Sequence, residues 1–112
     1  MRNTLIVLLI FPALILAQNS QKKIVASQFM VYGNCEMCKK RIESATLSLK
    51  GVKYVSWSPQ SKNFSIIYNS TKVSIDDVKK KIADVGHDNS SYKATDEVYD
   101  NLHGCCKYRD PE

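Results

Sequence analysis

Cys35 and Cys38, three residues apart, are the side chains of this sequence whose type and spacing are best suited to chemistry. They lie in Tyr-Gly-Asn-Cys-Glu-Met-Cys-Lys-Lys-Arg, between an apolar run typical of a strand and an amphipathic stretch typical of a helix. At such a junction a pair of thiols can act as a soft-metal clamp or as a redox pair. The positive end of the helix dipole, with Lys39, Lys40 and Arg41 beside it, predicts that both thiols are more acidic than an isolated cysteine.

The elements that must position this pair follow from the periodicity of apolar residues and from the turn residues. Cys38, Ile42, Ala45 and Leu49 form one helical stripe. The second helix opens at Ser74, which can cap its free amides. The expected elements are a strand over 23–31, a helix ending at Gly51, strands over 52–57 and 63–68 joined by a hairpin, a helix over 75–85 and a short strand over 91–95.

The order strand, helix, strand, strand, helix, strand is that of the ferredoxin-like βαββαβ arrangement. It predicts an α+β fold with an antiparallel sheet and two helices on one face of that sheet.

Residues 23–95, with Gly-Asn-Cys-Glu-Met-Cys in the first loop and Gly86-His87-Asp88 after the second helix, resemble the heavy-metal-associated domain family. That family includes small copper chaperones, metal-ATPase leader domains and the periplasmic mercury-binding protein. The resemblance implies that Cys35 and Cys38 are the two metal thiolates. It also implies that Gly86 and His87 lie beside the metal loop. The sequence departs from the family at Gly33, where the family usually has the methionine that props the loop.

Two further residues near the pair each have two interpretations. Met37 is either a side chain that fills a gap under the loop or a third soft ligand. His87 is either a solvent-facing loop residue or a neighbour of the thiolates that tunes metal release over the pH range where imidazole titrates.

The C-terminal tail, residues 96–112, carries the vicinal pair Cys105 and Cys106. Because adjacent side chains tend to diverge, we expect one of the two to act, as a third metal ligand. Residues 96–103, if extended, are long enough to return from the far end of a final strand to the metal loop. The alternative is that the two cysteines form a structural or intermolecular disulfide.

The N-terminus predicts export. Residues 1–17 combine one positive charge, an apolar run over 5–16 and Ala17 as a cleavage point, which is the pattern of a signal peptide. Ile15 fits that pattern poorly and leaves an uncleaved membrane anchor as the alternative. Residues 18–22 are expected to be disordered. The protein is then periplasmic or secreted, a compartment in which four cysteines would ordinarily form two disulfides.

The chain has 16 basic and 11 acidic residues. Its two lysine-rich runs, 39–41 and 79–81, are either solvated helix faces or a surface that steers an acidic partner. Nucleic acid is disfavoured as a partner, because the chain is exported and lacks the aromatic strand signature of RNA-binding domains.

These features predict a protein that is not an enzyme. It carries or scavenges a soft ion, Cu(I) first and otherwise Hg(II) or Zn(II), and passes it by ligand exchange to a metal-transport protein with an acidic docking surface. Membrane contact is expected only if the signal is uncleaved. The alternatives are a thiol-disulfide oxidoreductase and a small interaction module that is stapled by disulfides.

Overall fold

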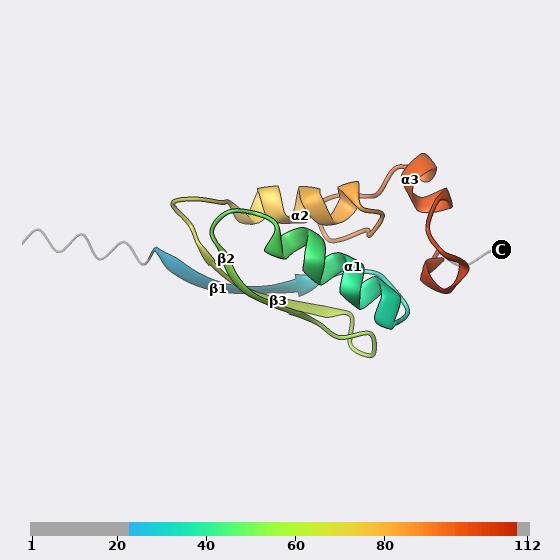
Figure 1. The fold of residues 1–112 in the computed structure, drawn as a ribbon, viewed down its shortest axis with the longest axis horizontal. Helices are drawn as coiled ribbons and strands as arrows, with labels where there is room; N and C mark the ends of the chain where they lie inside the picture. Colours follow the sequence, from blue (N-terminus) through green and yellow to red (C-terminus); the bar gives the residue numbers. More distant parts are fainter. Residues whose placement is uncertain (1–22, 110–112) are drawn as a thin grey trace, which may run out of the picture.

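In the computed structural model, which describes residues 23–109, two helices lie over one face of a three-stranded sheet (Figure 1). The elements are β1 (Ile24–Met30), α1 (Glu36–Leu47), β2 (Val52–Trp57), β3 (Asn63–Asn69), α2 (Ile75–Asp84), α3 (Asp96–Asp100) and the 3-10 turn η1 (Gly104–Cys106). The signal peptide, cleavage point and disordered segment predicted for residues 1–22 lie outside the described residues. Across 23–109, each helix is too short or too polar to cross a bilayer.

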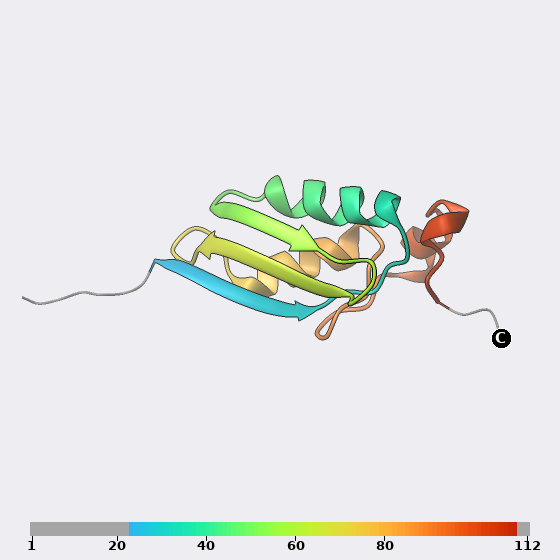
Figure 2. The same ribbon diagram turned by 90° about the horizontal axis from the view of Figure 1, so that it is seen from below.

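The sheet is antiparallel, with β3 between β1 and β2 (Figure 2). Exposure alternates strictly along β1, so that Val25, Ser27 and Phe29 are turned toward the helices, as the sequence predicts. An irregularity in pairing with β3 separates Val52 from Tyr54 at the start of β2. The predicted ferredoxin-like class is confirmed, with helices on one face of an antiparallel sheet.

Helix α1 buries a stripe that differs in part from the expected one. Cys38 and Ile42 are fully buried as predicted, but Thr46 replaces Ala45 as the third buried position. The Thr46 hydroxyl donates to the carbonyl of Ile42 at 2.9 Å, which lets a polar side chain occupy the core. The helix ends at Leu47, so Leu49 packs from the following turn rather than from the helix.

Helix α2 begins and ends as the sequence predicts. The Ser74 side chain accepts from the Asp77 amide, while the Asp77 carboxylate accepts from the Ser74 amide, a reciprocal capping box. Val78 and Ile82 are buried against the sheet. Gly86 follows with φ +111°, a left-handed conformation that favours glycine after a helix.

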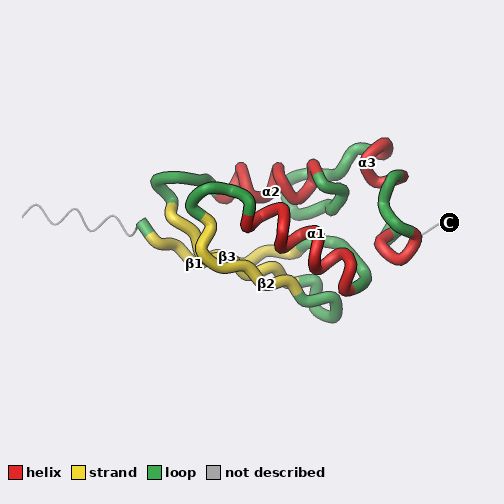
Figure 3. Tube along the Cα trace, viewed as in Figure 1, coloured by secondary structure: helices red, strands yellow, loops and turns green. Residues whose placement is uncertain are grey.

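The predicted final strand over 91–95 is wrong. In the described part of the chain, a fourth strand would pair with β1. In its place the structure has a single isolated bridge, between Val31 and Asn89. The Asn89 carboxamide oxygen accepts from the amides of Ser91 and Tyr92, which turns the chain away from the sheet edge. The segment between α2 and α3 therefore runs as loop (Figure 3).

The consequence is a different course for the C-terminal segment. It does not run along the sheet and return as an extended chain. It stays at the end of the molecule where α1 begins, as the short helix α3 followed by η1 (Figure 1).

The core lies between the sheet and the two long helices. Its most deeply buried large side chains are those of Trp57, Phe64, Ile42, Ile66, Ile82, His87, Val31, Val78, Thr46, Cys38 and Cys106. Two of the four thiols are thus part of the hydrophobic core, and one of these comes from the C-terminal segment.

Candidate metal-binding site

The first cysteine pair occupies the junction between the loop after β1 and helix α1. Cys35 is the N-cap residue, with extended backbone angles (φ −140°, ψ 176°), and is partly exposed. Cys38 lies in the first helical turn and is fully buried. Their sulfurs are 3.5 Å apart, so the structure brings the predicted pair together as free thiols.

Trp57 supports this loop in place of the methionine that the family usually provides. A Cβ at Gly33 would lie only 3.0 Å from the Trp57 ring and 3.1 Å from Cys38 Cβ. The indole Nε1 donates to the carbonyl of Val31 at 2.9 Å. Glycine at position 33 therefore lets the indole pack directly beneath the cysteine loop, a support that the sequence analysis did not identify.

The C-terminal segment brings both of its cysteines to the same place. Cys35 Sγ lies 3.2 Å from Cys105 Sγ and 3.6 Å from Cys106 Sγ. The two vicinal sulfurs are 3.9 Å apart, about twice the length of a disulfide bond. The expectation that their side chains diverge is wrong, because the η1 turn directs both sulfurs toward Cys35. That one of them acts as a third metal ligand stays a prediction.

A polar clamp holds the C-terminal segment against the domain. The Arg109 guanidinium donates to both Asp88 carboxylate oxygens, at 2.8 and 3.2 Å, and to the Ala94 carbonyl at 2.7 Å. The Tyr108 hydroxyl donates to the Gly86 carbonyl at 2.7 Å and accepts from the Asp88 amide at 2.8 Å. Asp88 is partly buried, which raises the pKa of its carboxyl, but the Arg109 hydrogen bonds outweigh this and hold the pKa below its usual value.

The acidities of the two loop cysteines diverge. Burial raises the pKa of Cys35, but the Cys38 amide and the neighbouring thiols outweigh it and lower the pKa to about 7. Deeper burial raises the pKa of Cys38 to about 12. The prediction that both thiols are acidic is therefore wrong for Cys38, where desolvation of the thiolate exceeds the effect of the helix dipole.

The tail thiols are also weak acids. The hydrogen bond to Cys35 raises the pKa of Cys105, and burial raises the pKa of Cys106. Cys35 is the one thiol of the four with a lowered pKa.

Arg41 supplies positive charge to the buried side of the cluster. Its Nη1 lies 3.3 Å from Cys106 Sγ. From the sequence, Arg41 is only part of a basic run, because its contact depends on the position of Cys106, which is distant along the chain.

The exposed fraction of each side chain excludes one of the two interpretations of Met37 and one of those of His87. Met37 is 44% exposed, so it does not fill a gap under the loop; its sulfur lies 3.9 Å from Cys105 Sγ. His87 is fully buried, so it is not a solvent-facing residue. Its Nδ1 donates to the Tyr32 carbonyl at 2.8 Å, and burial lowers its pKa to about 4. This lowered pKa argues against a role that depends on titration near neutral pH.

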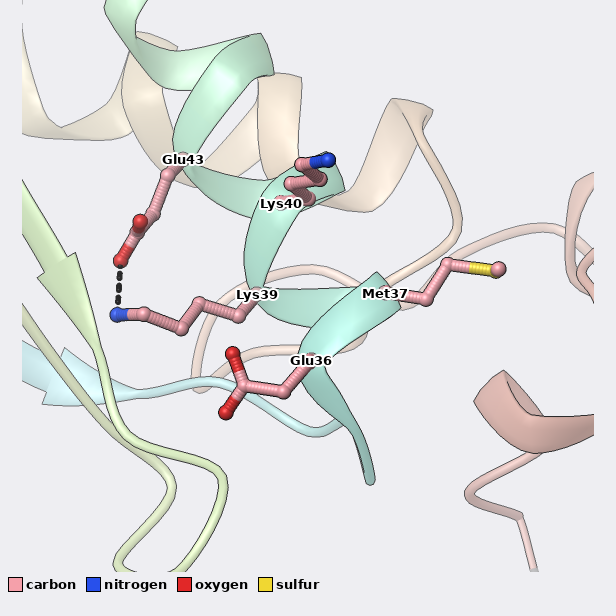
Figure 4. A pocket seen from close by; sticks show the side chains of 5 residues that line it. All are labelled: Glu36, Met37, Lys39, Lys40 and Glu43. Atoms are coloured by element: carbon pink, nitrogen blue, oxygen red, sulfur yellow. Dashed lines mark hydrogen bonds and ion pairs between the residues drawn. The ribbon is translucent and has the colours of Figure 1, made fainter.

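The surface beside the pair is mixed in charge. Figure 4 shows the Lys39 ammonium turned toward the Glu43 carboxylate, 2.6 Å away, while Lys40 and Met37 extend outward. Lys39 also donates to the Trp57 carbonyl at 2.9 Å. Of the basic run over 39–41, only Lys40 is exposed.

Residues 29–88 match the family model of the heavy-metal-associated domain, and the chain belongs to this family. It is therefore a metal-binding domain of this family, and the matched residues include Cys35 and Cys38. The match ends at Asp88, so that α3, Cys105 and Cys106 lie beyond it.

Individual relatives agree with this assignment. The copper chaperone CopZ of Staphylococcus epidermidis is 31% identical over 55 residues, which are 49% of this chain and 81% of that protein. A solved structure of the CopZ metallochaperone superposes with a TM-score of 0.57 at 29% identity, covering 58% of this chain and 98% of that one. Oxidised MerP from Ralstonia metallidurans CH34 shares the fold, with a TM-score of 0.51 at 19% identity over 59% of this chain and 96% of that one.

Proposed function

We propose that this protein is exported and that it carries or scavenges Cu(I) through Cys35 and Cys38, with a third sulfur from Cys105 or Cys106. The observation that supports this most directly is the position of Cys35 Sγ, which lies within 3.6 Å of three other thiol sulfurs. Thiolates select soft ions such as Cu(I). Likeness to copper chaperones favours copper over Hg(II) and Zn(II). Export rests on the signal pattern of residues 1–17.

The four thiols have different parts in the proposed exchange. Cys35 is partly exposed and has the lowest pKa, so it is the first thiol to engage an incoming ion and the first that a partner's thiol reaches. Cys38 is held in the core and retains the ion while Cys35 exchanges. A third sulfur from the tail raises the coordination number and slows exchange. This favours storage or detoxification over rapid delivery.

The partner in delivery is a metal-transport protein whose docking surface is acidic. Lys40 is the exposed cation nearest the pair along the chain and supports such an encounter electrostatically. Lys39 and Arg41 contribute less, since both are engaged within the domain. We assign no nucleic-acid partner and no catalytic turnover to the site.

The experiment compares reduced wild-type protein with the Cys35→Ser/Cys38→Ser variant in competition with a Cu(I) chelator. Wild-type protein should retain at least one ion per chain, and the double variant should lose tight binding while keeping its circular dichroism spectrum. His103→Ser, an exposed change in the tail, is the matched control and should bind as wild type does. Wild-type affinity in the double variant would show that the site lies elsewhere. Catalytic reduction of insulin that depends on Cys35 would favour the oxidoreductase alternative.

A further inference from the structure

We propose that the four thiols form one basin that binds two Cu(I) ions at once, with Cys35 as the thiolate that both ions share. One ion lies between Cys35 and Cys38. The second lies among Cys35, Cys105 and Cys106. This inference rests on the proposed function, because it adds a second ion of the same kind to the same site.

The arrangement of the sulfurs is that of two overlapping sets rather than one tetrahedron. The sulfurs of Cys35, Cys105 and Cys106 all lie within 4.8 Å of one another, and Cys38 is not a member of that group. Cys38 instead approaches Cys35 from the helix, at 3.5 Å. Cys35 belongs to both sets, and a single ion between Cys35 and Cys38 leaves the outer thiol of the tail without a metal.

The distances within the second set fit three ligands of one ion. Metal–thiolate bonds of about 2.3 Å place two sulfurs about 4 Å apart in a trigonal plane. The distances from Cys35 Sγ to Cys105 Sγ and Cys106 Sγ are 3.2 and 3.6 Å, and the vicinal pair is 3.9 Å apart. Small side-chain rotations are enough to admit an ion.

The backbone of the tail makes this use of adjacent cysteines feasible. In η1 the Cys106 amide donates to the His103 carbonyl at 2.8 Å, and the Lys107 amide donates to the Gly104 carbonyl at 3.2 Å. This tight turn presents an exposed sulfur from Cys105 and a buried one from Cys106 to the same neighbour. Two thiols that diverge in an extended chain here converge.

The tail is also joined directly to the cysteine loop. The Asn34 side-chain amide donates to the Lys107 carbonyl at 3.2 Å. Asn34 directly precedes Cys35, and Lys107 directly follows Cys106. With the clamp formed by Asp88, Tyr108 and Arg109, this contact fixes the two sets relative to each other before metal binds. Such preorganisation lowers the entropic cost of assembling the cluster.

The surroundings of the basin suit a cluster with net negative charge. Four thiolates and two Cu(I) ions carry two negative charges, and the thiol protons pass to solvent as the ions bind. The Arg41 guanidinium, 3.3 Å from Cys106 Sγ, offsets part of that charge on the buried side. On the outer side the Met37 thioether, 3.9 Å from Cys105 Sγ, places a further soft atom at the edge of the cluster.

The test is an anaerobic titration of the reduced chain with Cu(I) in the presence of a competing chelator, read by native mass spectrometry. Wild-type protein should bind two ions, and X-ray absorption at full loading should show a copper–copper vector. Cys105→Ser/Cys106→Ser should stop at one ion, because it removes two ligands of the second ion and leaves Cys35 and Cys38 in place; its fold is checked by circular dichroism. Cys38→Ser should also lose one of the two ions. His103→Gln is the control and should still bind two.

The outcomes separate this inference from the proposed function. Wild-type protein that saturates at one ion, or a Cys105→Ser/Cys106→Ser variant that binds two, would overturn the two-ion basin and leave metal binding by Cys35 and Cys38 intact. Wild-type protein that retains no Cu(I) against the chelator would overturn both. A single ion bound by all four cysteines, with no copper–copper vector, would replace the basin by one four-sulfur site.

Discussion

The sandwich of residues 24–88 and the C-terminal segment of residues 89–109 form one site but differ in how much polar contacts add to apolar burial. The sandwich is organised by apolar burial, with Trp57, Phe64 and Ile66 between sheet and helices. The C-terminal segment adds three buried side chains to that core, Tyr99, Leu102 and Cys106, and is also held by directional polar contacts, of which the Arg109–Asp88 ion pair is the centre. The scaffold of the cysteine pair is therefore expected to stay folded when contacts of the C-terminal segment are lost. The supply of additional sulfurs depends on three buried side chains and on a few hydrogen bonds.

This difference gives the two regions different expected responses to substitution. Damage in the sandwich should unfold the domain. Damage in the clamp should leave the domain folded and withdraw Cys105 and Cys106 from Cys35.

The largest expected effect is that of Trp57→Ala. Removing a fully buried indole that supports the cysteine loop should lower the free energy of unfolding by about 3–5 kcal/mol, as for other large-to-small changes in a core. Urea unfolding followed by circular dichroism measures it. Tyr54→Ala on the same strand is the matched control, because Tyr54 is 52% exposed and its loss should change stability by only about 0.5 kcal/mol. Equal effects of the two changes would contradict the assignment of the core.

Arg109→Gln should lower the stability of the fold less than Trp57→Ala does, but it should weaken metal binding at the site. It breaks the ion pair with Asp88 and loosens the clamp, so Cu(I) retention should fall by about 10- to 100-fold, as for other residues that orient ligands. The free energy of unfolding should fall by less than about 2 kcal/mol. Chelator competition and urea unfolding on the same samples measure the two quantities. Lys93→Gln, an exposed change nearby, should alter neither; unchanged retention in Arg109→Gln would mean that the clamp does not position the tail.

The third prediction compares the thiols without changing the sequence. Because thiolate is the reactive form, alkylation of Cys35 by iodoacetamide should rise with pH and reach half of its maximal rate at about pH 7. Cys38 should stay unmodified in the folded protein at that pH, because burial raises its pKa to about 12 and shields it. Peptide mapping by mass spectrometry gives both rates. Equal modification of the two cysteines at pH 7 would contradict the difference in their environments.

The same division between regions explains what the sequence could predict. Strict alternation along β1, the stripe through Cys38 and Ile42 and the Ser74 cap are local signals, and each is confirmed. They fix the ferredoxin-like arrangement and the placement of the first cysteine pair, so the scaffold and the centre of the site were predictable.

The rest of the site depends on contacts between residues distant along the chain. The fourth strand fails because the Asn89 side chain satisfies the following amides locally, which a count of apolar residues does not register. The convergence of Cys105 and Cys106 on Cys35 follows from that failure and from the Asp88–Arg109 pair, 21 residues apart. The carboxylate of Asp88, directly after Gly86-His87, and the arginine three residues after the vicinal cysteine pair were the signals that could have suggested the clamp.

The central claim is that the C-terminal segment adds a sulfur ligand to the Cys35–Cys38 pair. The number of sulfur ligands around bound copper, measured by X-ray absorption, tests it most directly. The protein is loaded anaerobically with less than one Cu(I) per chain, and copper K-edge spectra are compared between wild type and Cys105→Ser/Cys106→Ser. The account predicts three sulfur ligands in wild-type protein and two in the double variant, whose fold is checked by circular dichroism. Two sulfur ligands in both proteins would contradict it.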